Sequence, residues 1–168
     1  MYNLHALLRK ALEMCDKEGI PYRTISSIKM NGRLSRAWGR CKHNRGSDIF
    51  TIEICKTIAD DTITPESGAL AIILHEIIHT CEGCFNHGTL FKSYGDRFIK
   101  YGYTDIGNAC TDAVALQMDV EKYELSKKYI CKCERCGYTI TQNKASHFIT
   151  HMSSYIHTGC GGHFIRVK

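Results

Sequence analysis

Residues 70–88, LAIILHEIIHTCEGCFNHG, contain three histidines and a glutamate whose spacing is typical of a zinc enzyme. His75 and His79 are four residues apart, so on a helix they project from the same face and their imidazoles can bind one ion. Glu76 follows the first histidine and can contact water on that ion without being a ligand. In this HExxH pattern zinc lowers the pKa of its water towards ~7, and the glutamate accepts the proton as the hydroxide attacks a carbonyl.

A third ligand is needed, because a catalytic zinc normally has three ligands from the protein and an open fourth position. His87 has the best spacing, and Gly83 can adopt the positive φ that turns the chain back toward the helix. The alternatives, whose spacing is less suitable, are Glu82, Asp96 and Asp112. The flanking residues AIIL and II are apolar, and an apolar helix does not bury two imidazoles and a carboxylate without compensation. The sequence therefore predicts a catalytic zinc.

A second metal site is predicted near the C-terminus. Cys133 and Cys136 in CERCG have the spacing of a zinc knuckle, whose tight turn lets two thiolates bind one metal. His157 and Cys160 in HTGCGG have the same two-residue gap and are followed by glycines suited to such a turn. We expect these four side chains to bind a structural zinc. The alternatives are Cys131 in place of either knuckle cysteine, and a Cys2His2 finger completed by His147 and His151.

The segment HEIIHTCEGCFNHGTLFKSY resembles the SprT-like metallopeptidases, in which HExxH is followed by a short loop, a third histidine, a glycine and an aromatic residue. His87, Gly88 and Phe91 occupy those places, and seven residues separate His79 from His87, so the metzincin pattern does not fit. AWGRCKHN and IFTIEIC resemble the β-hairpin that precedes the metal helix of that family. The resemblance runs from the first helix to a C-terminal zinc ribbon, although His157 stands where that ribbon usually has a cysteine.

The resemblance implies a zinc-dependent endopeptidase with His75, His79 and His87 as ligands and Glu76 as the base. It implies two zinc ions, one catalytic and one structural. It also suggests a link to DNA, because relatives of the Spartan type cleave proteins crosslinked to DNA.

Periodicity and turn signals predict the elements that position these residues. A helix is expected over residues 3–18, three antiparallel strands over 23–30, 34–41 and 48–55, and further helices over 90–100 and 106–127. The metal helix runs to Cys81, with Thr64 as N-cap and Pro65 at its first position. The expected fold is α+β, with a zincin-like metallopeptidase domain over residues 1–127 and a small β zinc ribbon over residues 128–168.

Several further residues have more than one interpretation. Cys81 and Cys84 could be a redox switch, part of a four-cysteine site with Cys133 and Cys136, or reduced thiols that pack the loop. The cysteines expected in the core are Cys15, Cys41, Cys55 and Cys110. Trp38 and Tyr94 are either core residues or substrate platforms. Tyr101 and Tyr103 could each donate a hydrogen bond to an oxyanion, and their spacing does not choose between them.

Composition limits the location and the partners. The chain has 168 residues, 43% of them hydrophobic, and no apolar run approaches the ~18 residues of a membrane helix. Charges at helical intervals in the first twenty residues argue against a signal peptide, so we expect an intracellular protein with reduced cysteines and no membrane association. The net charge of +5 is mild, and the lysines and arginines are spread along the chain.

We therefore expect a hydrolase that cleaves protein substrates, including proteins associated with nucleic acid. An extended substrate could add as a strand along the edge of the hairpin in residues 34–55. The alternative from another class is a non-catalytic, zinc-containing nucleic-acid-binding protein, and a redox-regulated scaffold built on CEGC is a third. The residues that would contact phosphates are Arg33, Arg36, Arg40, Lys42, Arg45, Lys132, Arg135, Lys144, Arg166 and Lys168.

Overall fold

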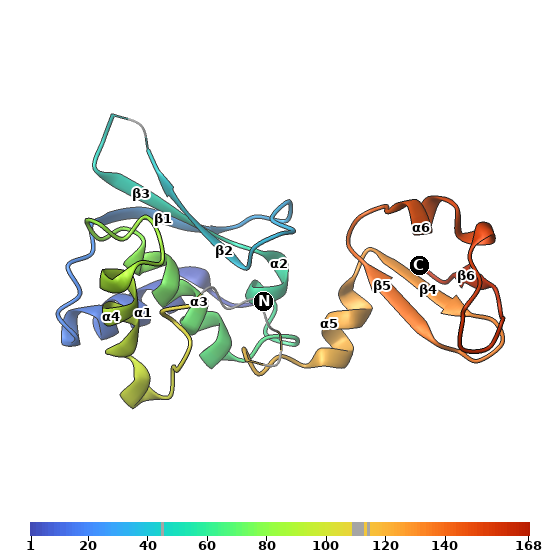
Figure 1. Cartoon of the computed structure of the whole chain (residues 1–168). Helices are drawn as coiled ribbons and strands as arrows, with labels where there is room; N and C mark the ends of the chain where they lie inside the picture. Colours follow the sequence, from blue (N-terminus) through green and yellow to red (C-terminus); the bar gives the residue numbers. More distant parts are fainter. Residues whose placement is uncertain (45, 109–112, 114) are drawn as a thin grey trace. The chain divides into compact units, whose positions relative to one another are not determined.

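A mixed three-stranded sheet with helices packed on one of its faces builds the first part of the chain (Figure 1). The computed structural model describes residues 1–44, 46–108, 113 and 115–168. The chain divides into two compact units, Met1–Val120 and Glu121–Lys168. Together the units define an α+β fold in which each unit has its own three-stranded sheet.

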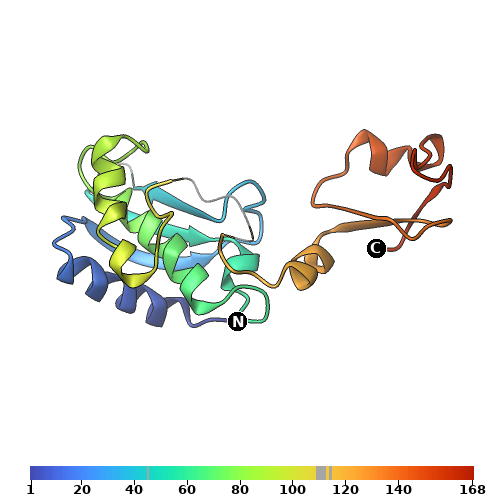
Figure 2. The ribbon, with the colours of Figure 1, turned by 60° about the horizontal axis from the view of Figure 1, so that its bottom comes forward.

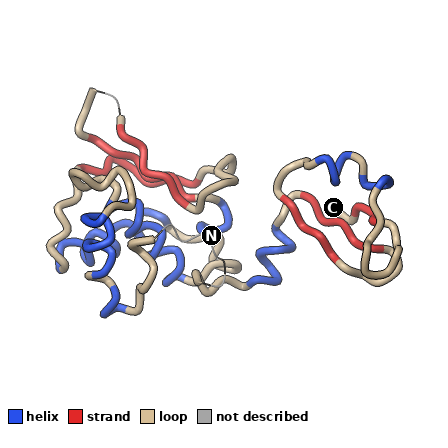
Figure 3. Tube along the Cα trace, viewed as in Figure 1, coloured by secondary structure: helices blue, strands red, loops and turns tan. Residues whose placement is uncertain are grey.

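Within the described residues, the first unit contains its sheet, four α-helices and one 3-10 helix (Figure 3). Its elements are α1 (Leu4–Lys17), β1 (Thr24–Met30), β2 (Gly39–His43), β3 (Ile49–Ile54), α2 (Lys56–Ala59), α3 (Glu66–Ile78), α4 (Thr89–Asp96) and the 3-10 helix η1 (Ile99–Tyr101). The predicted first helix is confirmed. The helix predicted over residues 90–100 forms as α4 and then continues as a separate 3-10 turn.

The sheet is mixed, so the prediction of three antiparallel strands is wrong for the first of them. Strand β3 lies in the centre, pairs antiparallel with β2 and pairs parallel with β1. A hairpin joins β2 to β3, so β1 pairs with the other edge of β3. Residue periodicity does not show whether β1 runs parallel or antiparallel to β3. The strand predicted over residues 34–41 begins only at Gly39. Because β3 is central, β2 lies at an edge of the sheet.

Helices α1 and α3 pack side by side on one face of the sheet, and α4 contacts α3 (Figure 2). The alternating residues Phe50, Ile52 and Ile54 of β3 are at most 1% exposed, as expected for strand residues that face a helical layer. Helix α3 is buried along most of its length because it contacts α1, the sheet and α4. Its apolar sequence is therefore explained by its position in the core.

Two local predictions for this unit need correction or completion. Pro65, not Thr64, is the N-cap of α3, because the Thr64 hydroxyl donates instead to the carbonyl oxygen of Thr57. Cys15 and Cys55 are buried core residues as predicted, whereas Cys41 is only half-buried.

The helix predicted over residues 106–127 is wrong for the described residues that precede Val120. Only α5 (Val120–Ser126) is helical, and residues 106–108 and 115–117 form turns and bends. Backbone groups in this segment bond to other elements: the Ile106 carbonyl accepts from the His75 ring, and the Asp119 N–H donates to Ile63. Gln117 has a φ of 55°, a left-handed conformation that interrupts a helix. Cys110, predicted to be a core residue, lies outside the described residues.

The second unit is built on a small antiparallel sheet. Its elements are β4 (Tyr129–Cys133), β5 (Thr139–Gln142), α6 (His147–Thr150), the 3-10 helix η2 (Met152–Ser154) and β6 (Phe164–Arg166). Strand β4 is central and pairs antiparallel with both β5 and β6. Its few buried apolar side chains form a core too small to supply much stability, and units of this size usually need a disulfide or a metal.

No helix in the described ranges combines the length and the apolar character needed to cross a bilayer.

The outer face of the first sheet holds a buried carboxylate among basic side chains. Glu53 of β3 lies 2.6 Å from Arg40, 3.4 Å from Lys42 and 3.9 Å from Lys29, all measured from nitrogen to carboxylate oxygen. The hydrogen bond from Arg40 contributes most to lowering the pKa of Glu53 to about 2, against the opposing effect of burial. Arg40 and Lys42, predicted as phosphate contacts, therefore already pair with a carboxylate.

This pairing predicts a pH-dependent contribution to stability. Because the pKa of Glu53 is lower in the folded state, its contribution is complete above the unfolded pKa of ~4.3 and disappears as pH falls toward 2. We expect Glu53→Gln to lower the free energy of unfolding by roughly 2 kcal/mol at pH 7, and the difference from wild type to vanish near pH 2. Urea unfolding followed by fluorescence of Trp38, the only tryptophan, measures it.

The exposed α1 residue Glu13, changed to Gln, is the matched control and should alter the free energy of unfolding by less than ~0.5 kcal/mol. A difference between Glu53→Gln and wild type that stayed constant from pH 7 to pH 2 would contradict the ion-pair account.

Candidate metal centres

Three histidine rings converge at the C-terminal end of α3. His75 lies in the last turn of the helix, His79 is its C-cap, and His87 follows in the loop before α4. The Nε2 atom of His75 lies 3.2 Å from Nε2 of His79 and 3.0 Å from Nε2 of His87. The structure thus brings together the three histidines that the sequence singles out, and their ligand atoms can hold one metal ion.

Backbone carbonyls fix the tautomer and the orientation of two of these rings. Nδ1 of His75 lies 2.8 Å from the carbonyl oxygen of Ile106, and Nδ1 of His79 lies 2.8 Å from that of Cys84. Because a carbonyl oxygen only accepts, both Nδ1 atoms carry the proton and both Nε2 atoms have a free lone pair. Such second-layer hydrogen bonds are typical of metal-binding histidines.

An aromatic side chain supports all three rings from one side. Phe91 of α4 is fully buried, and its ring centroid lies 4.9 Å from that of His75, 4.5 Å from His79 and 4.8 Å from His87. This packing limits the rotation of the imidazoles. The aromatic residue that follows the third histidine in the sequence pattern is therefore part of the mechanical support of the site.

The charge state of the rings fits a metal site. Burial lowers the pKa of His75 to about 4, and it also lowers the pKa of His79. Both rings are therefore neutral near pH 7, which is the form that binds a metal. The Nε2 lone pairs of His75 and His79 face one another at 3.2 Å and repel unless a cation lies between them, and a set of three imidazoles suits zinc among other transition metals.

Glu76 follows His75 in α3, where β2 passes close to the helix. Its side chain is 6% exposed, and burial raises its pKa to about 7 although the backbone N–H of Cys41 hydrogen-bonds the carboxylate. Gly39 of β2 makes this approach possible, because a Cβ atom there would lie 2.6 Å from Oε1 of Glu76. Local sequence patterns give no role to Gly39 or to the Cys41 backbone. Only the tertiary contact between β2 and α3 reveals them.

The other candidates for third ligand do not join the group of three histidines found among the described residues. Glu82 points to solvent with its side chain 91% exposed and lies 3.5 Å from Arg23. Asp96 is exposed at the end of α4, and Asp112 lies outside the described residues. Gly83 has a φ of 75°, as expected for the residue that turns the loop back.

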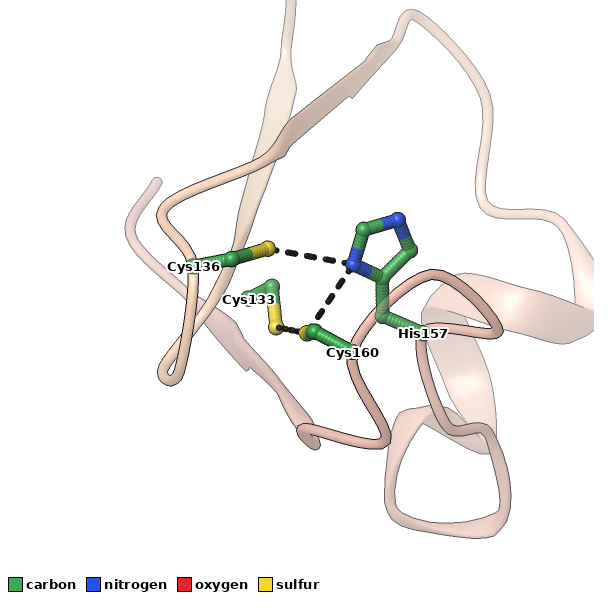
Figure 4. A group of neighbouring side chains, drawn as sticks. All are labelled: Cys133, Cys136, His157 and Cys160. Atoms are coloured by element: carbon green, nitrogen blue, oxygen red, sulfur yellow. Dashed lines mark hydrogen bonds between the residues drawn. The ribbon is translucent and has the colours of Figure 1, made fainter.

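A second cluster lies in the second unit and consists of Cys133, Cys136, His157 and Cys160 (Figure 4). Nδ1 of His157 lies 3.1 Å from the sulfur of Cys136 and 3.2 Å from that of Cys160, while the sulfurs of Cys133 and Cys160 are 3.5 Å apart. Three sulfurs and one imidazole nitrogen gathered in this way are a donor set of structural zinc.

Two similar turns carry these four side chains. Cys133 to Cys136 is followed by Gly137 with a φ of 78°, and His157 to Cys160 is followed by Gly161 with a φ of 70°. In both turns the glycine N–H donates to the carbonyl of the first ligand residue, at 2.9 Å and 2.7 Å. Residues that carry a side chain rarely adopt this positive φ, so glycine is strongly favoured at both positions.

The local electrostatics of the cluster favour a thiolate. Burial opposes ionisation of the Cys133 thiol, but the backbone N–H groups of Cys136 and Arg135 hydrogen-bond its sulfur, and its pKa falls to about 6. Arg135 also donates to the carbonyl oxygen of Cys160 at 2.6 Å and thereby connects the two turns. A thiolate is the form that binds zinc.

The side chains of the alternative ligand sets do not join this cluster. His147 and His151 stack on each other with ring centroids 4.1 Å apart and do not join the cysteine cluster, so the Cys2His2 arrangement is wrong. Cys131 is a buried residue of β4 and is not a member of the cluster.

The remaining sequence candidates have ordinary structural roles or lie near the histidine triad. Cys81 and Cys84 are buried free thiols, and burial raises the pKa of Cys81 to about 12, which favours packing over redox exchange. The Tyr101 hydroxyl donates to Glu18 at 2.6 Å, whereas Tyr103 lines a cavity beside His75. Trp38 and Tyr94 are half-buried.

No protein-family model matches this chain, and a search of curated proteins gives no match either. The resemblance to the SprT-like metallopeptidases therefore rests on the quoted motifs, and the findings establish two sites that could hold a metal.

Zinc content gives a direct prediction for both centres. We expect the native protein to hold two zinc ions per chain, His87→Ala to hold about one, and Cys160→Ser to keep the histidine-bound ion while losing the other. The loss of the second ion should also unfold the Glu121–Lys168 unit, because its core is small. Elemental analysis after dialysis against a weak chelator, together with circular dichroism, measures both effects.

His5→Ala, an exposed histidine on α1, and Cys131→Ser, a cysteine outside the cluster, are the matched controls and should each retain two zinc ions. A single zinc per wild-type chain that His87→Ala left in place would contradict the triad as a metal site.

Proposed function

We propose that the chain is a zinc metalloendopeptidase of the SprT-like type. The observation that carries this proposal is the gathering of three imidazole ligand atoms within 4.8 Å of one another, with a buried carboxylate at the residue that follows His75 in the same helix. A purely structural zinc is usually enclosed by four protein ligands, whereas only three groups gather here among the described residues.

His75, His79 and His87 would hold the ion. Bound zinc would supply a Lewis acid for the scissile carbonyl and would make water acidic enough to attack near neutral pH. Glu76 accepts the proton of the attacking water at its carboxylate and later donates it to the leaving amine. Burial raises the pKa of this carboxyl, which makes it a better proton acceptor. The Cys41 N–H holds the carboxylate in place during both steps.

The substrate binds in this proposal as an extended strand along the free edge of β2. Strand β2 pairs with β3 on one side only, and the Cys41 N–H on its other side already reaches Glu76. A peptide that pairs with this edge has its backbone next to the carboxylate and the histidine rings. The edge used by the substrate is then Gly39–His43, a shorter segment than residues 34–55.

Binding to nucleic acid is the second candidate, and the distribution of charge favours it. Residues 121–168 contain eight lysines and arginines against three glutamates, and the remaining residues contain equal numbers of basic and acidic side chains. The whole net charge of +5 therefore belongs to the second unit. Arg166 and Lys128 lie over the Tyr129 ring, at 4.8 Å and 5.2 Å from its centroid, a combination suited to phosphates and bases. The two functions are compatible in one chain.

Glu76→Gln tests the catalytic proposal. We expect the variant to retain two zinc ions and to lose casein digestion by about 10²–10⁴-fold, because the amide cannot accept a proton. Glu82→Gln, a change at an exposed side chain in the loop between His79 and His87, is the matched control and should digest casein like wild type. A wild-type protein that binds single-stranded DNA and two zinc ions but digests no casein, with or without that DNA, would favour the non-catalytic alternative.

Gly39→Ala tests whether the close approach of β2 positions Glu76. The added Cβ would lie 2.6 Å from Oε1, so the carboxylate must move, and we expect kcat to fall by about 10²-fold with both zinc ions retained. Gly32→Ala is the matched control, because a Cβ there meets no atom within 4 Å.

If Gly39 acts through Glu76, then adding Gly39→Ala to Glu76→Gln should cause no further loss of activity. An additional loss of the same size in the double variant would show that Gly39 acts by another route.

A further inference from the structure

We propose that a close backbone contact between Gly95 and Gly107 positions His75 for binding the metal ion. Gly95 lies in the last turn of α4, and Gly107 follows Ile106 in the segment after η1. Both glycines are buried. The inference rests on the histidine metal site of the proposed function and adds to it two positioning residues that contact no ligand atom themselves.

The contact leaves no room for a side chain on either glycine. A Cβ atom on Gly95 would lie 2.5 Å from the backbone nitrogen of Gly107 and 2.7 Å from its Cα, and a Cβ on Gly107 would lie 3.2 Å from the Cα of Lys92. Ordinary contacts between carbon atoms are ~3.5–4.0 Å long. The atoms met are all backbone atoms, which cannot rotate away. The two glycines therefore let α4 and the segment that follows η1 pack backbone to backbone.

The contact includes the carbonyl group that holds His75. The same Cβ on Gly95 would lie 3.2 Å from the carbonyl carbon of Ile106, and the oxygen of that carbonyl accepts the Nδ1 proton of His75 at 2.8 Å. The Ile106 side chain is 3% exposed, so it anchors this segment in the core. The approach of α4 therefore sets how far the Ile106 carbonyl lies from the His75 ring.

Helix α4 also supports the His75 ring from a second direction. Phe91 precedes Gly95 by one helical turn and lies on the same face of α4. Its ring centroid lies 4.9 Å from that of His75. One helix thus packs against the imidazole and against the carbonyl group that orients it. Because outer contacts of this kind set the affinity of metal-binding histidines, a shift of α4 should weaken the site.

Zinc affinity of Gly95→Ala provides the first test. The added Cβ requires α4 and residue 107 to separate by roughly 1 Å. A displacement of that size takes the bond between His75 and Ile106 out of hydrogen-bonding range. We expect the zinc dissociation constant of the triad to rise roughly 10–100-fold, while the ion of the cysteine cluster stays as tightly bound as in wild type. Competition with a chromophoric chelator measures both ions in the full chain.

Two further glycine variants complete the series. Gly107→Ala creates a milder contact, so it should raise the dissociation constant by about threefold or more, and it serves as the test if Gly95→Ala does not fold. Gly32→Ala, whose Cβ meets no atom within 4 Å, is the matched control. Alanine favours a helix more than glycine does, so a weakened site in Gly95→Ala cannot be ascribed to a weaker α4. Wild-type zinc affinity in folded Gly95→Ala, or in folded Gly107→Ala, would overturn the proposal.

The Nδ1 protons of the histidines give a second readout. In the zinc-loaded wild-type chain, long-range proton–nitrogen NMR spectra should show sharp Nδ1 proton signals for His75 and His79, because carbonyl groups shield both protons from exchange with water. In Gly95→Ala the His75 signal should broaden, while the His79 signal, held by Cys84, should stay sharp. An unchanged His75 signal, or equal broadening at both rings, would contradict the assignment.

Neither readout requires turnover, so the two proposals fail separately. A wild-type chain that binds zinc at the triad but cleaves no protein would overturn the proposed peptidase function. The positioning role of Gly95 and Gly107 would then still stand or fall on the zinc affinity and the His75 signal.

Discussion

The first unit depends on one electrostatic constraint: the Nε2 atom of His75 lies 3.2 Å from that of His79 and 3.0 Å from that of His87. The facing lone pairs of His75 and His79 repel at this separation, so the pair is stable only with a cation between the rings or with strong support from the surrounding chain. The structure supplies that support through the carbonyl groups of Ile106 and Cys84 and through the Phe91 ring. A site prepared in this way costs less to organise when the ion binds.

The mixed topology of the sheet explains how catalytic chemistry could be placed beside this centre. Because β3 fills the centre of the sheet, β2 is left at an edge and passes over the last turns of α3. Gly39 lets the strand approach closely enough for the Cys41 N–H to hold the buried Glu76 carboxylate. The same edge has backbone groups available for an extended chain. In the proposed function, one strand thus both positions the proton acceptor and offers a binding surface.

The parts of this molecule that local sequence patterns predict are those set by short-range periodicity. The i and i+4 spacing of His75 and His79, and the two paired knuckle turns, determine which side chains gather, and the structure brings these groups together. The direction of β1, the turns at residues 106–108 and 115–117 and the role of Gly39 are not accessible in this way. Each depends on a tertiary contact: β3 between two strands, Ile106 against His75, and β2 against Glu76. An apolar segment such as 106–127 resembles a helix until its backbone hydrogen bonds are accounted for.

Anomalous diffraction at the zinc edge, on crystals grown with excess zinc, tests the central claim most directly. The account predicts a peak ~2.0–2.1 Å from Nε2 of each of His75, His79 and His87, with no fourth protein side chain bound to that ion. Rings that point apart with no peak between them, or a fourth side chain that closes the coordination sphere, would contradict the account.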